Sequence, residues 1–320
     1  MKVLITGGSG LVGSTLTDLL LEQGHHVVGV DNFLTGRRDN LRPHERLHFV
    51  EGSITDAGLV RDMVEKFRPD AIVHTAASYK DPDDWETDAL VNTVGTAIVA
   101  RAAKDFGVKR LIYFQTALCY GIKPSQHPIR LDHPLDPANS SYAVSKTGGE
   151  HYVQMSGVDW VTFRLANVVG PRAVSGPLPI FFQRLTDGKQ CFVTPARRDY
   201  VFAADLASVV ARASAGEGKG TYHFSSGKDV PIQQIYDLTV KEMAINQYPE
   251  PQQKPLAPDD AASILLDPSR TFSDFGEINF TPIETIVERT IDYYRTHGVQ
   301  GGFTHLKDLG NKSDATATNA

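Results

Sequence analysis

"LITGGSGLVGSTL" (Leu4–Leu16) places three glycines where a short apolar run gives way to a helical pattern. Gly7, Gly10 and Gly13 follow one another at intervals of three residues. Glycines at such a turn allow a tight bend and let the backbone approach a pyrophosphate, whose charge then lies at a helix N-terminus. An ordinary strand–helix turn can carry the same glycines. The next strand helps to distinguish a pyrophosphate-binding loop from such a turn.

That next strand, "VVGVD", ends in Asp31, about twenty residues further along the chain. A carboxylate at this point accepts hydrogen bonds from an adenosine ribose. Because it also repels a 2′-phosphate, the sequence favours NAD over NADP. A surface aspartate that merely ends a strand is the alternative explanation.

Short apolar runs alternate with helical patterns through the first half of the chain. They predict strands at 2–6, 26–31, 71–77, 110–116 and 160–170, with helices at 10–24, 59–67 and 89–107. Repeated β-α units predict an α/β fold with a doubly wound parallel sheet of the Rossmann type. We assign residues 1–170 to a cofactor-binding domain, and we expect segments from the C-terminal half of the chain to rejoin this domain.

After Pro171 the regular alternation of strand and helix patterns ends, because proline and glycine cluster in "GPRAVSGPLP". We expect a smaller, mainly C-terminal substrate-binding lobe over residues 171–300. The final residues, 301–320, are polar and aperiodic, and we expect them to form a disordered tail.

The composition of the 320 residues is ordinary for a globular protein, with 41% hydrophobic and 22% charged residues. A net charge of -6 without basic runs argues against nucleic acid and anionic membranes as partners, so we expect a small ligand. Cys119 and Cys191 lack neighbours at metal-ligand spacing, and we expect no metal site. No signal peptide or membrane span is evident, which predicts a cytoplasmic location.

The stretch "SSYAVSKTGGE" (Ser140–Glu150) contains the candidate catalytic pair. Tyr142 and Lys146 are four residues apart and share one helix face. An ordinary tyrosine titrates near ~10, and a nearby ammonium together with an oxidised nicotinamide favours the phenolate. Tyr142 is therefore the candidate acid–base group, although an amphipathic helix with a solvated lysine could show the same spacing.

Gly148 and Gly149 follow the pair inside the same predicted helix. Glycine in a helix costs roughly 0.5–1 kcal/mol relative to alanine, which calls for a compensating reason. Close packing against another backbone, from a partner helix or from the sheet, would supply one.

With these motifs, the chain resembles the extended short-chain dehydrogenase/reductase family as far as about Gly298. Further similar stretches are "VDNFLTGRRDNL", "HTAA", "VNTVGT", "RLANVVGPR" and "RRDYVFAADLA". This set is similar to the nucleoside-diphosphate-sugar epimerases and dehydratases. The resemblance implies that NAD is bound by Gly7, Gly10, Leu11, Val12, Gly13, Asp31, Asn32, Ser53, Ile54, Ala76, Ala77 and Lys146.

The resemblance also assigns Thr116, in "YFQTALCYG", as the hydroxyl that relays or orients the proton at Tyr142. Dehydratases and decarboxylases of the family carry a carboxylate two residues later, where this chain has Leu118. Members that epimerise carbons 3 and 5 carry a cysteine there; Cys119 is one place further on, and we expect it to be packed. Because Leu118 and the packed Cys119 cannot supply a further acid or base, these residues favour hydride transfer with one proton relay.

We therefore expect an NAD-dependent UDP-sugar 4-epimerase that works through a transient 4-keto sugar, in surface-polysaccharide or sugar-nucleotide biosynthesis. A dehydrogenase or reductase with net hydride transfer uses the same three residues and stays open. A 4,6-dehydratase and a non-catalytic NAD-binding protein are less favoured. The sugar, its substituents and the nucleotide are not defined by the sequence.

On the substrate side the resemblance implies Lys80, Asn167, Leu178, Phe192, Arg198 and Asp260. Arg198 and Asn167 would meet the diphosphate, since a guanidinium matches phosphate oxygens. The stretches "GPLPIFF" and "QCFVTP" would frame the nucleobase. Lys80 could meet a substrate carboxylate, but it also fits a solvated loop lysine.

Two departures from the family pattern affect these assignments. Relatives carry Arg-x-Gly-Asp late in the chain, of which only Asp260 is kept here. Ser53 stands where relatives usually have an aspartate that contacts adenine, so adenine recognition would depend on Ile54 and the backbone. His74 ends a buried strand, and we expect it to be a packed core histidine.

Two predicted helices bear on the oligomeric state. They begin near Ala89 and Tyr142 and carry long faces of alanine, valine and glycine. Relatives pair these helices into a four-helix bundle, so we expect a homodimer.

Overall fold

The computed structural model describes residues 1–79, 81–245, 250–257 and 260–299. Lys80 and the expected tail, 301–320, lie outside the described residues. No helix in the described part of the chain is long and apolar enough to cross a membrane.

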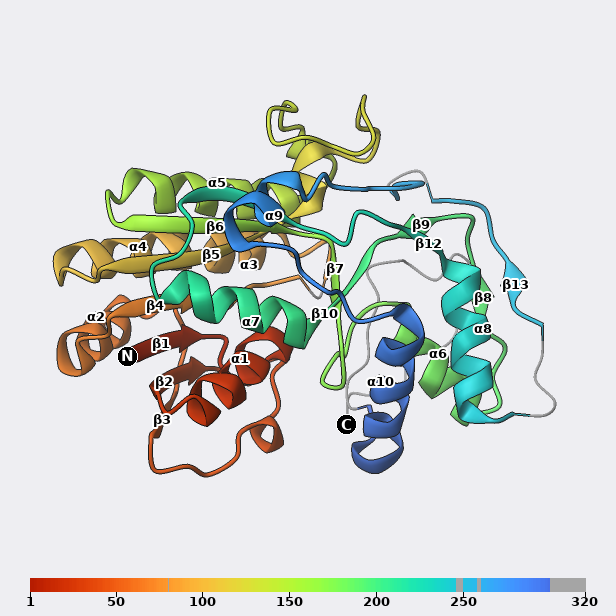
Figure 1. Cartoon of the computed structure of the whole chain (residues 1–320), viewed down its shortest axis with the longest axis horizontal. Helices are drawn as coiled ribbons and strands as arrows, with labels where there is room; N and C mark the ends of the chain where they lie inside the picture. The colour runs from red at the N-terminus through yellow and green to blue at the C-terminus, as the bar shows by residue number, and fades with distance from the viewer. Residues whose placement is uncertain (80, 246–249, 258–259, 300–320) are drawn as a thin grey trace.

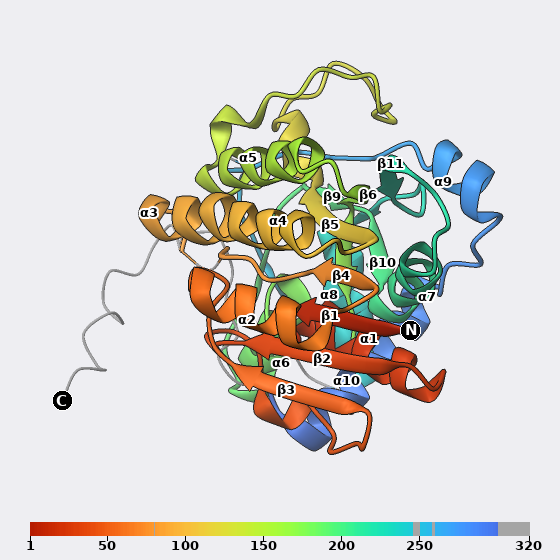
Figure 2. The same ribbon diagram turned by 90° about the vertical axis from the view of Figure 1, so that its left-hand side faces the viewer.

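Seven parallel strands form the central sheet, in the order β11-β6-β5-β4-β1-β2-β3 (Figures 1 and 2). The predicted doubly wound α/β fold is therefore confirmed. The strands are β1 (Lys2–Thr6), β2 (His26–Asp31), β3 (Leu47–Glu51), β4 (Ala71–His74), β5 (Arg110–Thr116), β6 (Asp159–Leu165) and β11 (Gly220–Phe224).

Helices cover both faces of this sheet (Figure 2). On one face, α2 (Ala57–Phe67), α4 (Thr96–Asp105) and α5 (Ser141–Met155) pack on alternate strand residues. On the other face lie α1 (Leu11–Glu22) and α7 (Ala203–Ser214). Complete burial of one large apolar side chain contributes roughly 1.5–3 kcal/mol, so these two layers hold the sheet in place.

The helices predicted at 10–24 and 59–67 differ from α1 and α2 by two residues at most, whereas three other predicted elements differ more. The strand predicted at 71–77 ends at His74, and the one at 160–170 divides into β6 and β7 (Asn167–Val169). The helix predicted at 89–107 begins with a π-helical segment, η2 (Ala89–Gly95), before α4. β3 is an edge strand with only partial burial, which explains why its apolar pattern is weak.

The C-terminal lobe is built around α6 (Pro177–Thr186), α8 (Ile232–Met243) and α10 (Ile283–His297), on the right of Figure 1. Aromatic pairs fill its core, such as Phe181 against Tyr236 with ring centroids 5.4 Å apart. The remaining elements are α3 (Trp85–Asp88), α9 (Ser269–Phe275), β8 (Phe192–Val193), β9 (Arg197–Arg198), β10 (Tyr200–Phe202), β12 (Val230–Pro231), β13 (Gln252–Gln253), η1 (Arg38–Asn40), η3 (Ala117–Tyr120) and η4 (Pro137–Asn139).

The two glycines of α5 face η2, the segment that packs beside it. A Cβ on Gly149 would lie 2.5 Å from the carbonyl oxygen of Asn92 and 2.6 Å from the hydroxyl of Tyr113. A Cβ on Gly148 would meet only the side chain of Thr93, at 3.1 Å. The expected close approach to another backbone is found at Gly149, where only a hydrogen fits.

We predict that Gly149→Ala lowers the free energy of unfolding by about 2–3 kcal/mol, because the added methyl group overpacks a rigid backbone contact. Gly148→Ala is the matched control. Its methyl group meets a side chain, and the gain in helix propensity offsets the crowding, so we expect a change below about 1 kcal/mol. Guanidinium unfolding of both variants measures the difference, and equal losses would contradict this account.

Candidate active site

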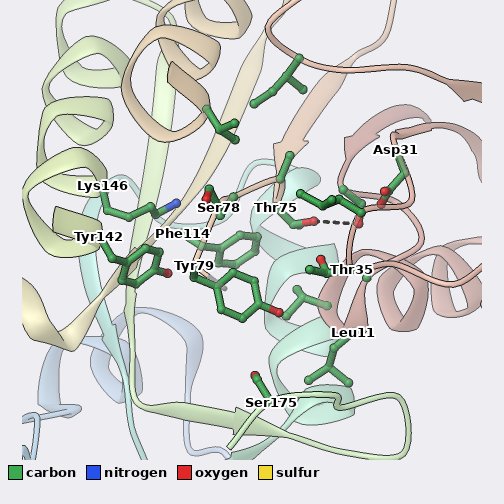
Figure 3. Close-up of a pocket in the computed structure, with 18 of the residues that line it drawn as sticks. Leu11, Asp31, Thr35, Thr75, Ser78, Tyr79, Phe114, Tyr142, Lys146 and Ser175 are labelled. Carbon is green, nitrogen blue, oxygen red and sulfur yellow. Dashed lines mark hydrogen bonds between the residues drawn. The ribbon is translucent and has the colours of Figure 1, made fainter. Parts of the chain in front are cut away.

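A cavity opens at the carboxyl ends of the strands, next to the point between β1 and β4 where the strand order reverses. Doubly wound folds bind their ligands at such a point. We call it the cofactor cavity (Figure 3). Its lining includes Gly7, Gly10, Leu11, Val12, Asp31, Asn32, Thr35, Ser53, Ile54, Ala76, Ala77, Ser78, Tyr79, Phe114, Thr116, Tyr142, Lys146, Val168 and Ser175.

The glycine loop has the shape that a pyrophosphate requires. Gly7 has φ +68°, a left-handed conformation, and a Cβ on it would meet the backbone nitrogen of Ala76 at 2.7 Å. Gly10 lines the cavity, and the nearest protein atom to a Cβ there is 3.4 Å away. A methyl group there would only touch the carbonyl oxygen of Gly7, so Gly10 leaves room at the start of α1, where a phosphate can approach the helix N-terminus.

Gly13 packs against the glycine loop itself. A Cβ there would lie 2.2 Å from the carbonyl oxygen of Gly7, and Gly13 does not line the cavity. It lets α1 pack closely on the loop, and its assignment as a cofactor contact stays a prediction.

Asp31 ends β2 at the cavity wall, and its side chain is held by backbone. One carboxylate oxygen accepts a hydrogen bond from the Ser9 N–H (3.0 Å), and the other accepts from the Phe33 N–H (2.8 Å). Each oxygen keeps a second lone pair for a ribose hydroxyl. Asn32, Ser53 and Ile54 line the cavity beside it, as do Ala76 and Ala77 after β4.

Tyr142 and Lys146 point from α5 into the cavity (Figure 3). Ser140 caps this helix by accepting a hydrogen bond from the Ala143 N–H (3.3 Å). The side chain of Lys146 is buried, with its Nζ 4.2 Å from the ring centroid of Tyr113. Burial lowers the pKa of Lys146 to about 7, although Glu150, one turn later, opposes that shift.

The environment of Tyr142 adds an effect that the sequence did not reveal. Burial raises the pKa of its phenol, and the neighbouring Tyr79 and Asp88 raise it further. Asp88 is itself buried, and its carboxylate oxygens have no hydrogen-bond partner among the described residues. The protein groups therefore favour the neutral phenol, and a positive charge has to lie nearby for Tyr142 to act as a base.

Thr116 ends β5 and lines the cavity with Tyr142. Its hydroxyl oxygen accepts a hydrogen bond from the Leu118 N–H (3.2 Å), and its own N–H donates to the side chain of Gln115 (2.8 Å). Leu118 does not line the cavity, and Cys119 is fully buried in an apolar cluster, where burial raises its thiol pKa to about 12.

His74 is a packed core residue, as expected. Its Nδ1 lies 2.6 Å from the hydroxyl of Thr6 and its Nε2 lies 2.9 Å from the hydroxyl of Thr96. Burial lowers the pKa of His74 to about 3, so the ring is neutral at physiological pH.

A second cavity lies between the sheet edge and the C-terminal lobe, and we call it the substrate cavity. Tyr79, Val168 and Ser175 line it as well as the cofactor cavity, so the two adjoin. Its other lining residues include Asn167, Pro177, Ile180, Phe181, Arg184, Phe192, Thr194, Arg198, Tyr200 and Asp260.

Arg198 pairs with Asp260 at 2.5 Å, and both side chains are largely buried. The alternative partner, Asp199, is buried and accepts hydrogen bonds from Ser225 and Ser226 instead. Asn167 lines the cavity while its side-chain NH₂ donates to the carbonyl oxygen of Asp199 (3.1 Å).

Leu178 does not reach the substrate cavity. It is buried in the core of the lobe, whereas Pro177, Phe181 and Arg184 of the same helix line the cavity. These three lie at i, i+4 and i+7 on one helix face, and Leu178 points elsewhere, so the structure gives no support to its assignment, which stays a prediction. Lys80 lies outside the described residues.

Sequence reasoning missed Tyr79, Ser175 and Tyr200. The hydroxyl of Tyr200 is buried without a hydrogen-bond partner among the described residues, and it lies beside Arg198 and Asp260. Strand alternation offered a signal, because Tyr200 lies two residues after Arg198 and so can share its face. Tyr79 and Ser175 lie in loops, for which no periodic signal exists.

Comparisons with known proteins agree with this geometry. Residues 3–224 match the model of the NAD dependent epimerase/dehydratase family. A UDP-glucose 4-epimerase of Mycolicibacterium smegmatis is 32% identical, over 92% of this chain and 99% of its own. Two solved Bordetella bronchiseptica enzymes are also similar. WbmH in complex with NAD+ has 61% identity and a TM-score of 0.92, over 93% of this chain and 99% of its own. WbmG in complex with NAD and UDP has 41% identity and a TM-score of 0.87, over 95% and 98%.

A Rossmann sheet with a glycine loop, an acidic ribose partner and a Tyr–Lys pair defines an NAD-dependent enzyme of the short-chain dehydrogenase/reductase type. The chain belongs to the NAD dependent epimerase/dehydratase family. The predicted family and the predicted cofactor, NAD, are thereby confirmed.

Proposed function

We propose that this enzyme inverts carbon 4 of a UDP-sugar through a transient 4-keto sugar, and that it serves sugar-nucleotide biosynthesis for surface polysaccharides. The observation that carries the proposal is the meeting of the two cavities. Tyr142, Lys146 and Thr116 line the cofactor cavity, and Arg198 lines the adjoining substrate cavity. The UDP-glucose 4-epimerase relative and the WbmG complex with NAD and UDP support the same reading.

The carboxylates of the two cavities argue against elimination of water. Among the described residues that line them, only Asp31 and Asp260 carry a carboxylate. Asp31 is held by two backbone N–H groups and Asp260 is paired with Arg198. Neither is placed beside Tyr142 to serve as a further acid or base. Asp88 does lie near Tyr142, but it lines neither cavity, so these residues support a single proton relay.

The reaction then uses the three residues in distinct roles. Tyr142 removes the proton of the 4-hydroxyl, directly or through the hydroxyl of Thr116, and returns it after the sugar has turned. Lys146 holds the nicotinamide ribose, and its ammonium favours the phenolate against the effect of burial. When bound, NAD accepts the hydride of carbon 4 and gives it back to the opposite face.

The substrate cavity provides the groups that a nucleoside diphosphate needs. The guanidinium of Arg198 is largely buried and fixed by Asp260, which prepares it for bidentate contact with phosphate oxygens. Asn167 and the unpartnered hydroxyl of Tyr200 add polar contacts, and the ring of Phe192 offers a face for the base.

We predict that Tyr142→Phe lowers kcat by about three orders of magnitude, because the proton relay is lost, while bound NAD is retained. Tyr152→Phe is the matched control, since it removes a phenol hydroxyl from the same helix outside both cavities; Tyr152 belongs to the exposed face of α5 that we propose below as a dimer contact, and phenylalanine keeps its apolar ring there. Proton NMR of UDP-hexoses, UDP-N-acetylhexosamines and UDP-hexuronic acids in deuterated water measures turnover without added NAD. Normal turnover in Tyr142→Phe would refute the role of Tyr142.

The same NMR assay on the unaltered enzyme tests the reaction itself. Inversion at carbon 4 without deuterium uptake and without net NADH supports the epimerase. Accumulation of NADH would favour a dehydrogenase, and deuterium next to a keto group would favour elimination.

We predict that Arg198→Ala weakens the binding of UDP by at least about ten-fold, because a charge-assisted phosphate contact is lost. Arg197→Ala is the control, since its side chain is half-exposed and bonded to Asp229. Titration calorimetry with UDP compares the two variants, and equal losses would argue against a diphosphate at Arg198.

We further propose that the protein is a homodimer formed through α5 and η2. Large apolar side chains are exposed along these elements, with Leu90, Val94 and Val144 each about half accessible and Met155 more so. Exposure of several large apolar side chains on neighbouring elements is unfavourable in water, and a second copy of the same helices would cover them.

Val144→Glu should shift the protein from dimer to monomer in sedimentation velocity, because the substitution places a charge in the proposed interface. Lys241→Glu, on an exposed position of α8, tests whether a new carboxylate alone has this effect. A monomeric unaltered protein would contradict the proposal.

A further inference from the structure

A buried ion pair joins the catalytic helix to the sheet, and none of the roles above uses it. Glu150 of α5 is fully buried, and its two carboxylate oxygens accept hydrogen bonds from the guanidinium of Arg164 on β6 (3.1 and 3.3 Å). Arg164 is almost as deeply buried. Taking two charges out of water is costly, so a pair in this position has to be supported by further hydrogen bonds.

The guanidinium of Arg164 is anchored on its other side. Its Nη1 donates a hydrogen bond to the hydroxyl of Tyr120 (2.6 Å), which lies 2.7 Å from Nε2 of His223. Nδ1 of His223 lies 3.0 Å from the carbonyl oxygen of Asp267, which can only accept, so Nδ1 carries the ring proton. Burial lowers the pKa of His223 to about 4, so the imidazole is neutral and its Nε2 accepts from Tyr120. A chain of neutral groups therefore fixes the ion-pair partner of Glu150.

Glu150 is connected to the cofactor cavity through Gln115. The side-chain NH₂ of Gln115 donates to a carboxylate oxygen of Glu150 (3.2 Å), and its carbonyl oxygen accepts from the N–H of Thr116 (2.8 Å). Because Gln115 is buried, its amide can make both hydrogen bonds in one orientation alone. The carboxylate of Glu150 thus selects the orientation that holds the backbone of Thr116.

Lys146 lies one helical turn before Glu150, and both side chains are buried on α5. In the described part of the chain, the other titratable groups that face this pair are Tyr142 with Asp88 and Tyr79 beside it, Tyr113 on β5, His74 on β4, Arg164 on β6, and Cys119 and Tyr120 of η3. The segment η2, which also packs against α5, contains no titratable residue. Burial keeps the phenols, the thiol and the imidazole neutral near neutral pH, so Glu150 supplies the negative charge one turn from Lys146.

We propose that Glu150 is a positioning residue of the active site, which holds Thr116 in place through Gln115 and keeps a negative charge one turn from Lys146. The inference rests on the proposed function, in which the ammonium of Lys146 favours the phenolate of Tyr142. Without the carboxylate, Lys146 loses its proton more easily, and Tyr142 becomes a weaker base.

The first test is the titration of Lys146 in the enzyme with its bound NAD. NMR of protein labelled with ¹³C at the lysine Cε follows the ammonium with pH, and Lys146→Met identifies the signal. Burial lowers the pKa of Lys146 to about 7, and Glu150 opposes this shift. We therefore expect Glu150→Gln to lower the midpoint by about one pH unit. Asp18→Asn is the matched control, because it breaks the ion pair of Asp18 with Arg172 outside both cavities and should leave the midpoint unchanged.

The second test is the pH dependence of kcat in the carbon-4 assay. If the midpoint moves from about 7 to about 6, the share of molecules with the ammonium falls about ten-fold at pH 8 and about two-fold at pH 6. The kcat of Glu150→Gln should fall by these two factors, with little change in the KM for the UDP-sugar. A purely structural loss would lower kcat equally at both pH values.

Gln115→Leu tests the connection to Thr116. It removes the acceptor of the Thr116 N–H and keeps the carboxylate of Glu150, so we expect kcat about ten-fold lower at both pH values. The midpoint of Lys146 should stay where it is. Unaltered kcat in this variant would overturn the positioning of Thr116.

Glu150→Gln leaves the guanidinium of Arg164 buried without its counter-charge, which can prevent folding. Glu150→Gln combined with Arg164→Met removes both charges and serves as the second variant. Arg164 is not among the groups that shift the pKa of Lys146, so the same lower midpoint is expected.

An unaltered midpoint of Lys146 in these variants would overturn the proposal and assign Glu150 to packing, and so would a kcat that falls equally at both pH values. The titration needs no turnover. A lowered midpoint in an enzyme whose unaltered form does not invert carbon 4 would refute the epimerase and keep the role of Glu150 at Lys146, whereas inversion with an unaltered midpoint would do the reverse.

Discussion

The contact between α5 and η2 is the constraint on which the active site depends. Gly149 brings the catalytic helix so close to the carbonyl group of Asn92 that no side chain fits between them. The amide of Asn92 then donates hydrogen bonds to the carbonyl oxygen of Ser78 (2.9 Å) and to the hydroxyl of Ser145 (3.0 Å). The positions of Tyr142 and Lys146 relative to the loop after β4 follow from this one close approach, because the helix that carries them cannot shift without breaking it.

The electrostatics of the site follow from its burial. The pKa of Lys146 is lowered to about 7 and that of Tyr142 is raised, so burial shifts both groups toward their neutral forms, while near neutral pH the ammonium of Lys146 is still present in a large share of molecules. His74, behind them, is also neutral. Charges that arrive with ligands therefore act in a site that is poorly screened, where their influence on proton transfer is large. This arrangement suits a reaction whose proton and hydride both return to the substrate.

The two-cavity arrangement comes from the way the chain leaves and rejoins the sheet. After β6 it forms β7 and the loop of Ser175, enters the C-terminal lobe, and returns through α7 and β11. The lobe is therefore connected to the sheet at the carboxyl ends of the strands, next to Tyr142. A ligand bound in the substrate cavity meets residues of both parts of the chain, and the loops around Tyr79 lie where the parts adjoin.

The sequence by itself determined the fold class and the cofactor and predicted the catalytic pair, because each depends on local spacing: glycines at a turn, a carboxylate at a strand end, and a tyrosine and a lysine one helical turn apart. Only the tertiary structure decided that Gly13 packs against Gly7, that Leu178 faces the lobe core, and that Tyr79 lines both cavities. These facts join residues far apart in the chain, or depend on which side of a helix meets its neighbour. Periodicity cannot show either, because it describes one element at a time, whereas packing is a property of several elements together.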